Sequence, residues 1–167
     1  MMVISREYHF SSAHQLDGHP KCGRMHGHNY KVVVEIELIG ELKRGGMVLD
    51  FQELDKFVKP IVEILDHRYI VSQDNTDFQP SRFDFLHAAE LAYIDIQYST
   101  AECLAKWFYD QIEGSFKWEK KQKPTYRVKA VTIWETEKSS ASYSRSSGTE
   151  VSGTETPGYS VEPVLHS

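Results

Sequence analysis

The sequence is poor in three features that mark particular classes of protein. It has two cysteines in 167 residues, Cys22 and Cys103, and they lie far apart, so they do not form a disulfide framework. No apolar run approaches the roughly 20 residues of a membrane span, and no leader-like segment precedes the first charged residues. Basic residues number 19 against 24 acidic ones and form no stripe, which argues against nucleic acid as a partner. We therefore expect a cytoplasmic protein without membrane or nucleic-acid partners.

Composition divides the chain into a domain and a tail. With 40% hydrophobic residues overall, residues 1–145 are expected to form one domain with a real core. Ser, Thr and Gly make up about half of residues 146–167, so this tail is expected to be flexible and is given no function. The stretch at about 72–98 has no clear pattern and is interpreted as an insertion.

Periodicity predicts the elements of the domain. Alternating residues predict strands at about 2–10, 29–39 and 126–135, with shorter ones at 91–98 and 141–145. Asp50, followed by Glu53, predicts a capping box. The apolar stripe of the helix that follows is Phe51, Leu54, Val58, Ile61 and Leu65. Pro60 should kink or tighten this helix. A second helix is expected with Thr100 as its N-cap and with its end at Gly114.

This order of elements predicts an α+β fold, an antiparallel four-stranded sheet with both helices on one face. The strand at 126–135 carries apolar residues on both predicted faces. Val128, Ala130 and Trp134 are assigned to one face, and Val131 and Ile133 to the other. A second apolar sheet face needs a cover, so we expect a homo-oligomer.

Three histidines share the same parity on two neighbouring strands. His26 and His28 are two residues apart, so in a strand their side chains lie on one face. His14 has the parity of Tyr8 and Phe10 in the preceding strand. If the two strands pair antiparallel, the three imidazoles meet at one end of one face. Three histidines without a fourth protein ligand are typical of a catalytic zinc with an open position.

Other interpretations of these residues stay open. A His-x-His pair on a strand is more often structural than metal-binding. Cys22, in the glycine-rich loop before His26, is either a base beside the metal or a fourth ligand that closes the site. His67 at a helix end can simply be a cation that relieves the helix dipole, although Asp66 can orient it where the helix has ended. Glu135 can bind a ligand at the end of an apolar strand or be exposed.

Five motifs in this order resemble the 6-pyruvoyl-tetrahydropterin synthase / 6-carboxy-tetrahydropterin synthase family. The motifs are Ser11-Ser12-Ala13-His14, Cys22-x3-His26-Gly27-His28-Asn29-Tyr30, Leu65-Asp66-His67, Thr100-Ala101-Glu102 and Trp134-Glu135-Thr136. The resemblance runs from about residue 3 to about residue 143. It implies the tunnelling fold, in which monomer sheets join into an oligomeric barrel, expected here to be a hexamer, with active sites between subunits.

The resemblance also implies a role for each site residue. His14, His26 and His28 would hold Zn²⁺, and Cys22, Asp66 and His67 would handle protons, the last two from a neighbouring subunit. Glu135 would anchor the pterin ring of 7,8-dihydroneopterin triphosphate, and Thr100 would line its pocket.

The spacing of Cys22 and His26 favours the 6-carboxy branch, which feeds the 7-deazaguanine (queuosine) pathway. Its members have the same Cys-x3-His-Gly-His spacing, whereas animal-type 6-pyruvoyl enzymes have a longer gap. Cys22 also argues against membership of a related branch whose members have glutamate at this position and make a folate precursor. The alternative from another class is a zinc-stabilised, non-catalytic pterin-binding module in which Cys22 closes the metal site.

Overall fold

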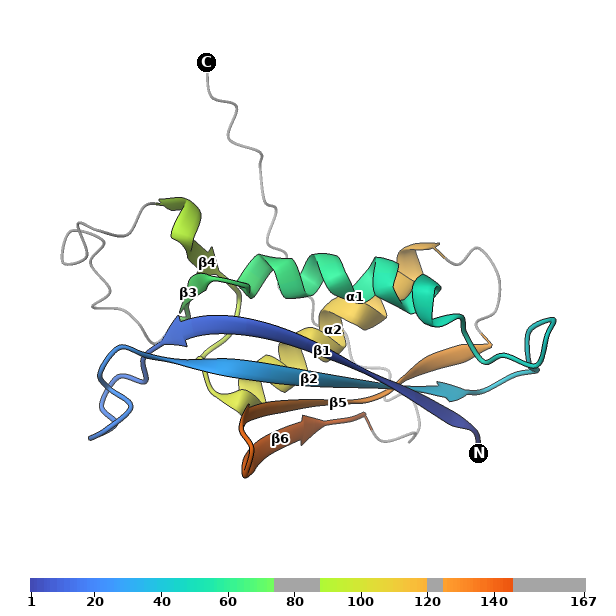
Figure 1. Ribbon diagram of the computed structural model, residues 1–167, viewed down its shortest axis with the longest axis horizontal. Coiled ribbons are helices and arrows are strands. Elements are labelled where there is room, and N and C mark those ends of the chain that lie inside the picture. Colours follow the sequence, from blue (N-terminus) through green and yellow to red (C-terminus); the bar gives the residue numbers. More distant parts are fainter. Residues whose placement is uncertain (74–87, 120–124, 146–167) are drawn as a thin grey trace, which may run out of the picture.

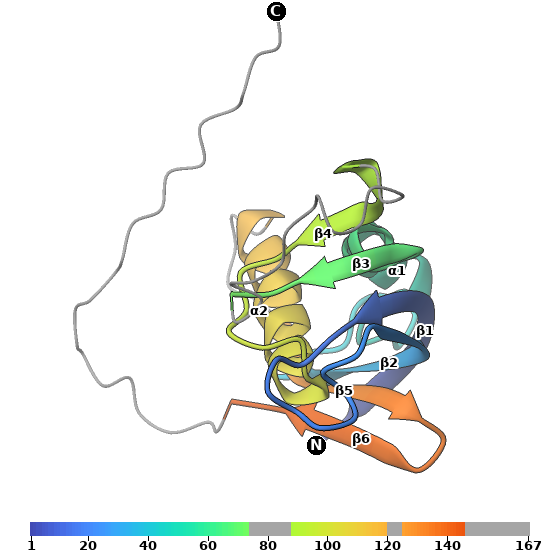
Figure 2. The same cartoon turned by 90° about the vertical axis from the view of Figure 1, so that its left-hand side faces the viewer.

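The computed structural model describes residues 1–73, 88–119 and 125–145, and Figures 1 and 2 show their arrangement. The elements in chain order are β1 (Val3–His14), β2 (His26–Leu38), α1 (Phe51–Leu65), β3 (Arg68–Val71), the short 3₁₀ helix η2 (Ala88–Glu90), β4 (Leu91–Tyr93), α2 (Ala101–Glu119), β5 (Tyr126–Thr136) and β6 (Ser139–Tyr143). The predicted tail and most of the predicted insertion lie outside these ranges.

One mixed sheet of six strands, in the order β4-β3-β1-β2-β5-β6, forms the frame. The pairs β1–β2, β2–β5 and β5–β6 are antiparallel, whereas β3 runs parallel to both β1 and β4. The α+β class is confirmed, but the prediction of four antiparallel strands was wrong. Strand β3 has only four residues, three of them buried in succession, so it shows no alternation that could reveal it.

The two helices pack against the same curled face of the sheet (Figure 2). On β1 and β2 this face carries the even-numbered residues, including the buried Phe10, Tyr30 and Val34. In α1, four of the five predicted stripe residues are buried, but Phe51 is 44% exposed. Phe51 is the first residue of the helix, where its ring lies under the Arg6 guanidinium, 5.5 Å from the centroid, and outside the core.

The predicted helix starts are confirmed, but one predicted end is wrong. Asp50 caps α1 by accepting a hydrogen bond from the Gln52 N–H, and Thr100 accepts from the Cys103 N–H. The second helix continues through Gly114 to Glu119. Gly114 does not have a positive φ, and the buried Phe116 packs in the core one turn later. This burial offsets the roughly 1 kcal/mol that a helical glycine costs.

A bulge in the β2–β5 ladder changes the faces of β5. Register shifts between Glu35 and Ile36, so that Ala130 pairs with Glu35 whereas Val128 pairs with Ile36. Val128 therefore joins Val131 on the helix-covered face, and both belong to the core cluster. The predicted division of β5 into two apolar faces was thus wrong, because the extra residue of a bulge reverses the alternation. The apolar residues of β5 therefore give no reason to expect an oligomer.

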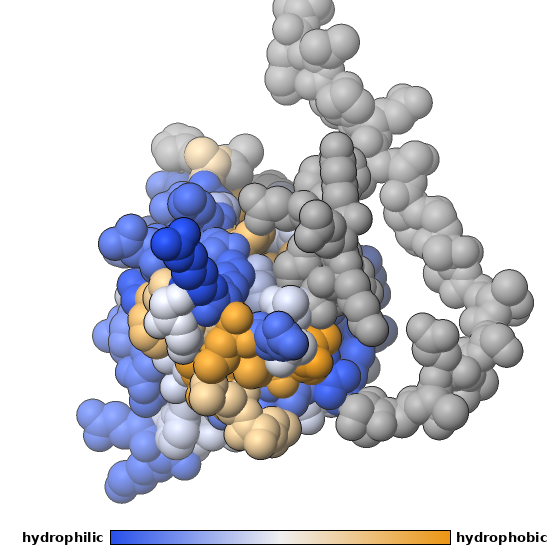
Figure 3. Space-filling model, turned by 90° about the vertical axis from the view of Figure 1, so that its right-hand side faces the viewer, coloured by the Kyte–Doolittle hydropathy of each residue, from blue (hydrophilic) through white to orange (hydrophobic). Residues whose placement is uncertain are grey.

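The end of the molecule opposite the histidines carries an apolar patch among hydrophilic side chains (Figure 3). The large hydrophobic side chains exposed on the segments that reach this end are Met1, Met2, Ile39, Leu42, Met47 and Phe51. Within the described ranges, no helix has the length and apolar character needed to cross a membrane.

Candidate metal centre

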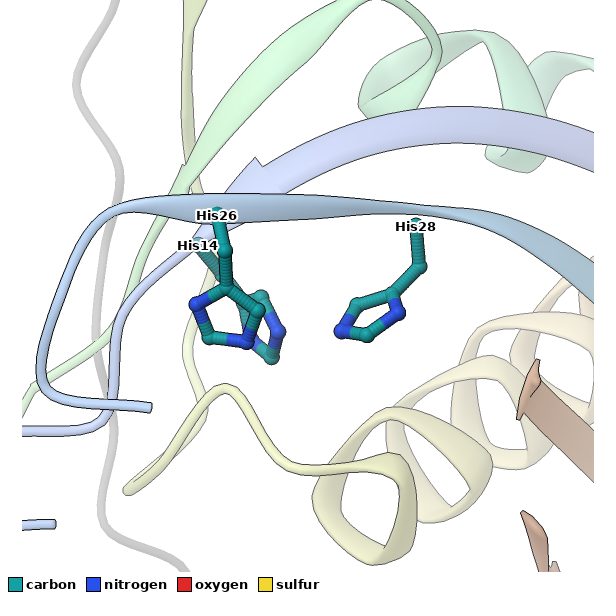
Figure 4. A group of neighbouring side chains, drawn as sticks. All are labelled: His14, His26 and His28. Carbon is teal, nitrogen blue, oxygen red and sulfur yellow. The ribbon is translucent and has the colours of Figure 1, made fainter. Parts of the chain in front are cut away.

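The register of β1 and β2 brings three histidines together, as predicted. His14 pairs directly with His26, and Ser12 with His28. The ring centroids lie 4.5 Å apart for His14 and His26, 5.2 Å for His14 and His28, and 5.1 Å for His26 and His28. Figure 4 shows the three rings projecting to the same side of the strands, toward the segment before α2. One ligand nitrogen from each ring lies within 4.8 Å of the other two.

Backbone carbonyls orient two of the rings for metal binding. His14 Nδ1 lies 2.8 Å from the carbonyl oxygen of Ser99, and His26 Nδ1 lies 2.7 Å from that of Arg24. Because a carbonyl only accepts, each Nδ1 carries the proton and each Nε2 keeps its lone pair. His14 Nε2 is buried and has no hydrogen-bond partner among the described residues. An orphaned buried acceptor of this kind, with its other nitrogen held by a carbonyl, suits a metal ligand.

The surroundings of His14 and His28 favour the neutral form of both imidazoles. Burial lowers the pKa of His14 to about 4, although the Ser99 carbonyl opposes this shift. Burial also lowers the pKa of His28, against the charge and backbone carbonyl of Glu135. A metal binds the neutral ring and competes with protons for it. Burial thus favours the neutral, metal-binding form of both His14 and His28.

Cys22 lies in the loop between β1 and β2 and outside the triad. Among residues 1–73, 88–119 and 125–145, the three histidines form the one group of His, Cys, Asp and Glu side chains that could hold a metal. Cys22 is a free, half-buried thiol, as is Cys103. In this conformation the protein offers three candidate ligands, and an ion held by them would keep a position open for substrate or water.

Asp66 and His67 form a bonded pair at the C-terminal end of α1. His67 Nδ1 lies 2.9 Å from Asp66 Oδ2, and the Ser11 N–H donates to Asp66 Oδ1 and lowers the pKa of that carboxyl. Among the described non-glycine residues, His67 alone has a positive φ, 56°. Residues held in this region often cluster at functional sites.

The His67 ring, whose side chain is 83% exposed, borders a cavity of about 480 Å³. Much of that cavity is lined by odd-numbered residues of β1 and β2, namely Ser11, Ala13, Gly27 and Asn29. These residues face away from the helices, because the even-numbered ones carry the core and His14. His28 reaches the cavity, but His14 and His26 do not line it. The Asp66–His67 pair of one chain is thus directed mainly to the other face of the sheet.

Glu135 lies near the end of β5, beside His28, and borders a second cavity of about 650 Å³. The lining of that cavity also includes Lys31 and Trp134, with the Lys31 ammonium 4.8 Å from the centroid of the indole ring. Thr100 directly follows Ser99, whose carbonyl holds His14. The structure therefore brings Glu135 close to His28, and Thr100 follows the residue that contacts His14.

Sequence reasoning missed the groups that orient the ligands. Ser99 and Arg24 act through backbone carbonyls, which any residue type carries, so their identities hold no signal. The pairing of Lys31 with Trp134 was also missed. Both large side chains lie on strands that carry predicted site residues, but their contact depends on the register of β2 and β5, which only the fold supplies.

A curled mixed sheet with two helices on one face and a three-histidine cluster at the end of a strand pair defines an α+β protein with a candidate metal centre. The model of the family described as 6-pyruvoyl tetrahydropterin synthase matches residues 3–146. The chain belongs to this family.

Individual relatives agree with this assignment. The chain is 31% identical over 150 residues to the 6-carboxy-5,6,7,8-tetrahydropterin synthase of Haemophilus influenzae, covering 86% of this chain and 99% of the relative. It is 44% identical over 72 residues to a putative 6-carboxy-5,6,7,8-tetrahydropterin synthase of Archaeoglobus fulgidus, covering 43% of this chain and 61% of the relative. The solved 6-pyruvoyl tetrahydropterin synthase of Caenorhabditis elegans superposes with a TM-score of 0.59 at 26% identity, covering 87% of this chain and 96% of that one.

Proposed function

We propose that this chain is a zinc-dependent 6-carboxy-5,6,7,8-tetrahydropterin synthase. It converts 7,8-dihydroneopterin triphosphate and one water to 6-carboxytetrahydropterin, acetaldehyde and triphosphate, within the 7-deazaguanine (queuosine) pathway. The observation that carries the proposal is the triad, in which three imidazoles present ligand nitrogens within 4.8 Å of one another. The names of the Haemophilus and Archaeoglobus relatives and the Cys-x3-His-Gly-His spacing support the 6-carboxy branch.

Each site residue has a task in this reaction. A bound Zn²⁺ supplies Lewis acidity toward hydroxyl and carbonyl oxygens of the substrate side chain. Cys22 removes a proton from side-chain carbon, and the electron pair released is taken up by the C=N bond of the pterin ring. His67, oriented by Asp66, moves protons between carbon and oxygen. Glu135 accepts the amino and ring N–H donors of the pterin with its two carboxylate oxygens, and Thr100 lines the ring pocket.

The placement of Asp66 and His67 supports an active site shared between copies. The pair is directed mainly to the sheet face opposite the one on which His14 lies, so the pair that serves a given metal comes from a neighbouring subunit. We propose a homo-oligomer, a hexamer, in which the sheets join into a barrel. The apolar patch at the end opposite the histidines (Figure 3) gives such an assembly further surface to bury.

The product mixture tests the function directly. Zinc-loaded protein is incubated with 7,8-dihydroneopterin triphosphate, and mass spectrometry identifies the products. We expect triphosphate, acetaldehyde and 6-carboxytetrahydropterin in equal amounts, because elimination and carbon–carbon cleavage follow each other in one site. Triphosphate with 6-pyruvoyltetrahydropterin and no acetaldehyde would assign the chain to the 6-pyruvoyl branch, the function of the Caenorhabditis neighbour. Release of no triphosphate would support the non-catalytic binding module.

Glu135→Ala should weaken pterin binding without loss of zinc. Removing a carboxylate that makes charge-assisted bonds to a desolvated ligand costs about 2–5 kcal/mol, and Glu135 contributes no atom to the triad. Calorimetry with a non-reactive pterin measures the affinity, and metal analysis measures the zinc. Glu137→Ala is the matched control, since Glu137 lines the same cavity and is exposed. Equal affinities for the two variants would make Glu135 an ordinary surface residue.

A further inference from the structure

The loop that carries Cys22 is closed by a network of hydrogen bonds around that residue. The Cys22 N–H donates to His19 Nδ1 at 2.9 Å. The Cys22 carbonyl accepts from the Leu16 N–H at 2.8 Å, and the His19 N–H donates to the Leu16 carbonyl at 3.1 Å. The N–H and the carbonyl of Cys22 are therefore both hydrogen-bonded within the loop. The partner of the N–H is the side chain of His19, and the partner of the carbonyl is a backbone group.

His19 makes the two hydrogen bonds of an N-cap residue, here at the start of a single turn over residues 20–23. Its ring accepts a hydrogen bond from the N–H three residues on, and its carbonyl accepts from the Gly23 N–H, four residues on, at 2.9 Å. Pro20 follows it, at the first-turn position where proline is favoured. A Cβ on Gly23 would lie 2.6 Å from the His19 carbonyl oxygen, so the tightness of this turn requires glycine after Cys22. The turn is thus specified at three positions around the thiol.

The two ends of the loop are tied to the metal centre. At one end, the Ser99 hydroxyl donates to the Gln15 carbonyl at 3.0 Å, and the Ser99 carbonyl accepts from His14. At the other end, the Arg24 carbonyl accepts from His26 Nδ1. The loop is therefore anchored by the groups that orient two of the histidines, and the turn at His19 fixes the backbone of Cys22 between these anchors.

We propose that His19 is a positioning residue that holds the backbone of Cys22 through its Nδ1 atom. With the N–H and the carbonyl of Cys22 both held, the direction of its Cα–Cβ bond is set, and the thiol moves only by rotation about that bond. A base must keep hydrogen-bond reach to the proton it removes, and small displacements of a catalytic group slow the reaction. This proposal rests on the proposed function, because it assumes that Cys22 acts on the substrate.

Three substitutions separate the acceptor atom from the rest of the side chain. His19→Ala removes the acceptor. His19→Asn places Oδ1 the same number of bonds from Cα as the imidazole Nδ1, and asparagine is a preferred N-cap. His19→Gln carries the same amide one bond farther out. All three are made in the full zinc-loaded chain, and Asp17→Ala is the control, because the Asp17 carboxylate bonds to Gln15 and not to Cys22.

We expect His19→Ala to lower kcat by about 3–10-fold, the range of one lost hydrogen bond, with KM and zinc content unchanged. Amide exchange in the segment 16–23, measured by mass spectrometry, should accelerate by a similar factor. His19→Asn should return both quantities to within about 2-fold of the unsubstituted chain, whereas His19→Gln should resemble His19→Ala. A residue that merely supports the fold would not show this dependence on the position of one acceptor atom.

Two results would overturn the proposal. One is exchange and turnover in His19→Ala equal to those of the Asp17→Ala control. The other is His19→Asn as impaired as His19→Ala. If the unsubstituted chain releases no triphosphate at all, the proposed function fails, and the exchange rates of the four variants still decide whether His19 holds the loop.

Discussion

His28→Ala should strip the protein of zinc and of its activity while the fold persists. His28 is one of three ligand donors, and two remaining imidazoles form an incomplete zinc site. His28 is half-buried and lies outside the core cluster, so its removal creates no large cavity. Metal analysis after dialysis should give far less than one zinc per chain, with a circular dichroism spectrum like that of the unsubstituted protein.

His28 is a better choice for this test than His14. His14 is buried and bonded to Ser99, so its truncation would leave a cavity and an unpaired carbonyl, and loss of metal could then follow from local unfolding. The matched control is His9→Ala, because His9 is an exposed histidine on the odd-numbered face of β1. The control should keep its zinc. Full zinc occupancy in His28→Ala would disprove the ligand assignment.

The parts of the site that parity determines were predictable from the sequence. His14, His26 and His28 share the faces of two long strands whose alternation is unbroken, so their convergence required only antiparallel pairing of neighbours. The register of β1 and β2 then confirmed it. The same reasoning placed Leu54, Val58, Ile61 and Leu65 on the buried side of α1.

Parity failed where the backbone departs from regular geometry. The bulge opposite Glu35 changes which residues of β5 face the helices, and no residue type in β5 marks it. His67 has a positive φ, so helical spacing does not predict the direction of its ring. Strand β3 follows α1 and pairs in parallel with β1. A short buried parallel strand appears in the sequence as a continuous apolar run without alternation, so periodicity does not reveal it.

The contacts that connect the site across the chain were also beyond the sequence. The Ser99 carbonyl meets His14 across 85 positions, and the Ser11 N–H meets Asp66 across 55. In each bond one partner is a backbone group, which every residue type carries, so the sequence does not indicate which residue provides it. They arise because the segment before α2 and the end of α1 both reach the end of the sheet where β1 ends and β2 begins (Figure 1).

Cys22→Ala should abolish most turnover while zinc stays near one per chain. The described ligand cluster contains His14, His26 and His28 but not Cys22, so the thiol is expected to act on the substrate and not on the metal. Loss of a positioned acid or base lowers the rate by roughly 10²–10⁴-fold. The measurement is kcat from triphosphate release, alongside metal analysis of the same preparation.

The other free cysteine supplies the control for this substitution. Cys103 is also half-buried, but it lies on α2, where it packs partly against the core. Cys103→Ala should therefore keep both turnover and zinc. A thiol reagent should inactivate Cys103→Ala, which retains Cys22, but should not lower the residual turnover of Cys22→Ala. A closed four-ligand site predicts the opposite for Cys22→Ala, because removal of the fourth ligand would weaken metal binding itself. Loss of zinc together with activity would thus identify Cys22 as a ligand and favour the binding module over the enzyme.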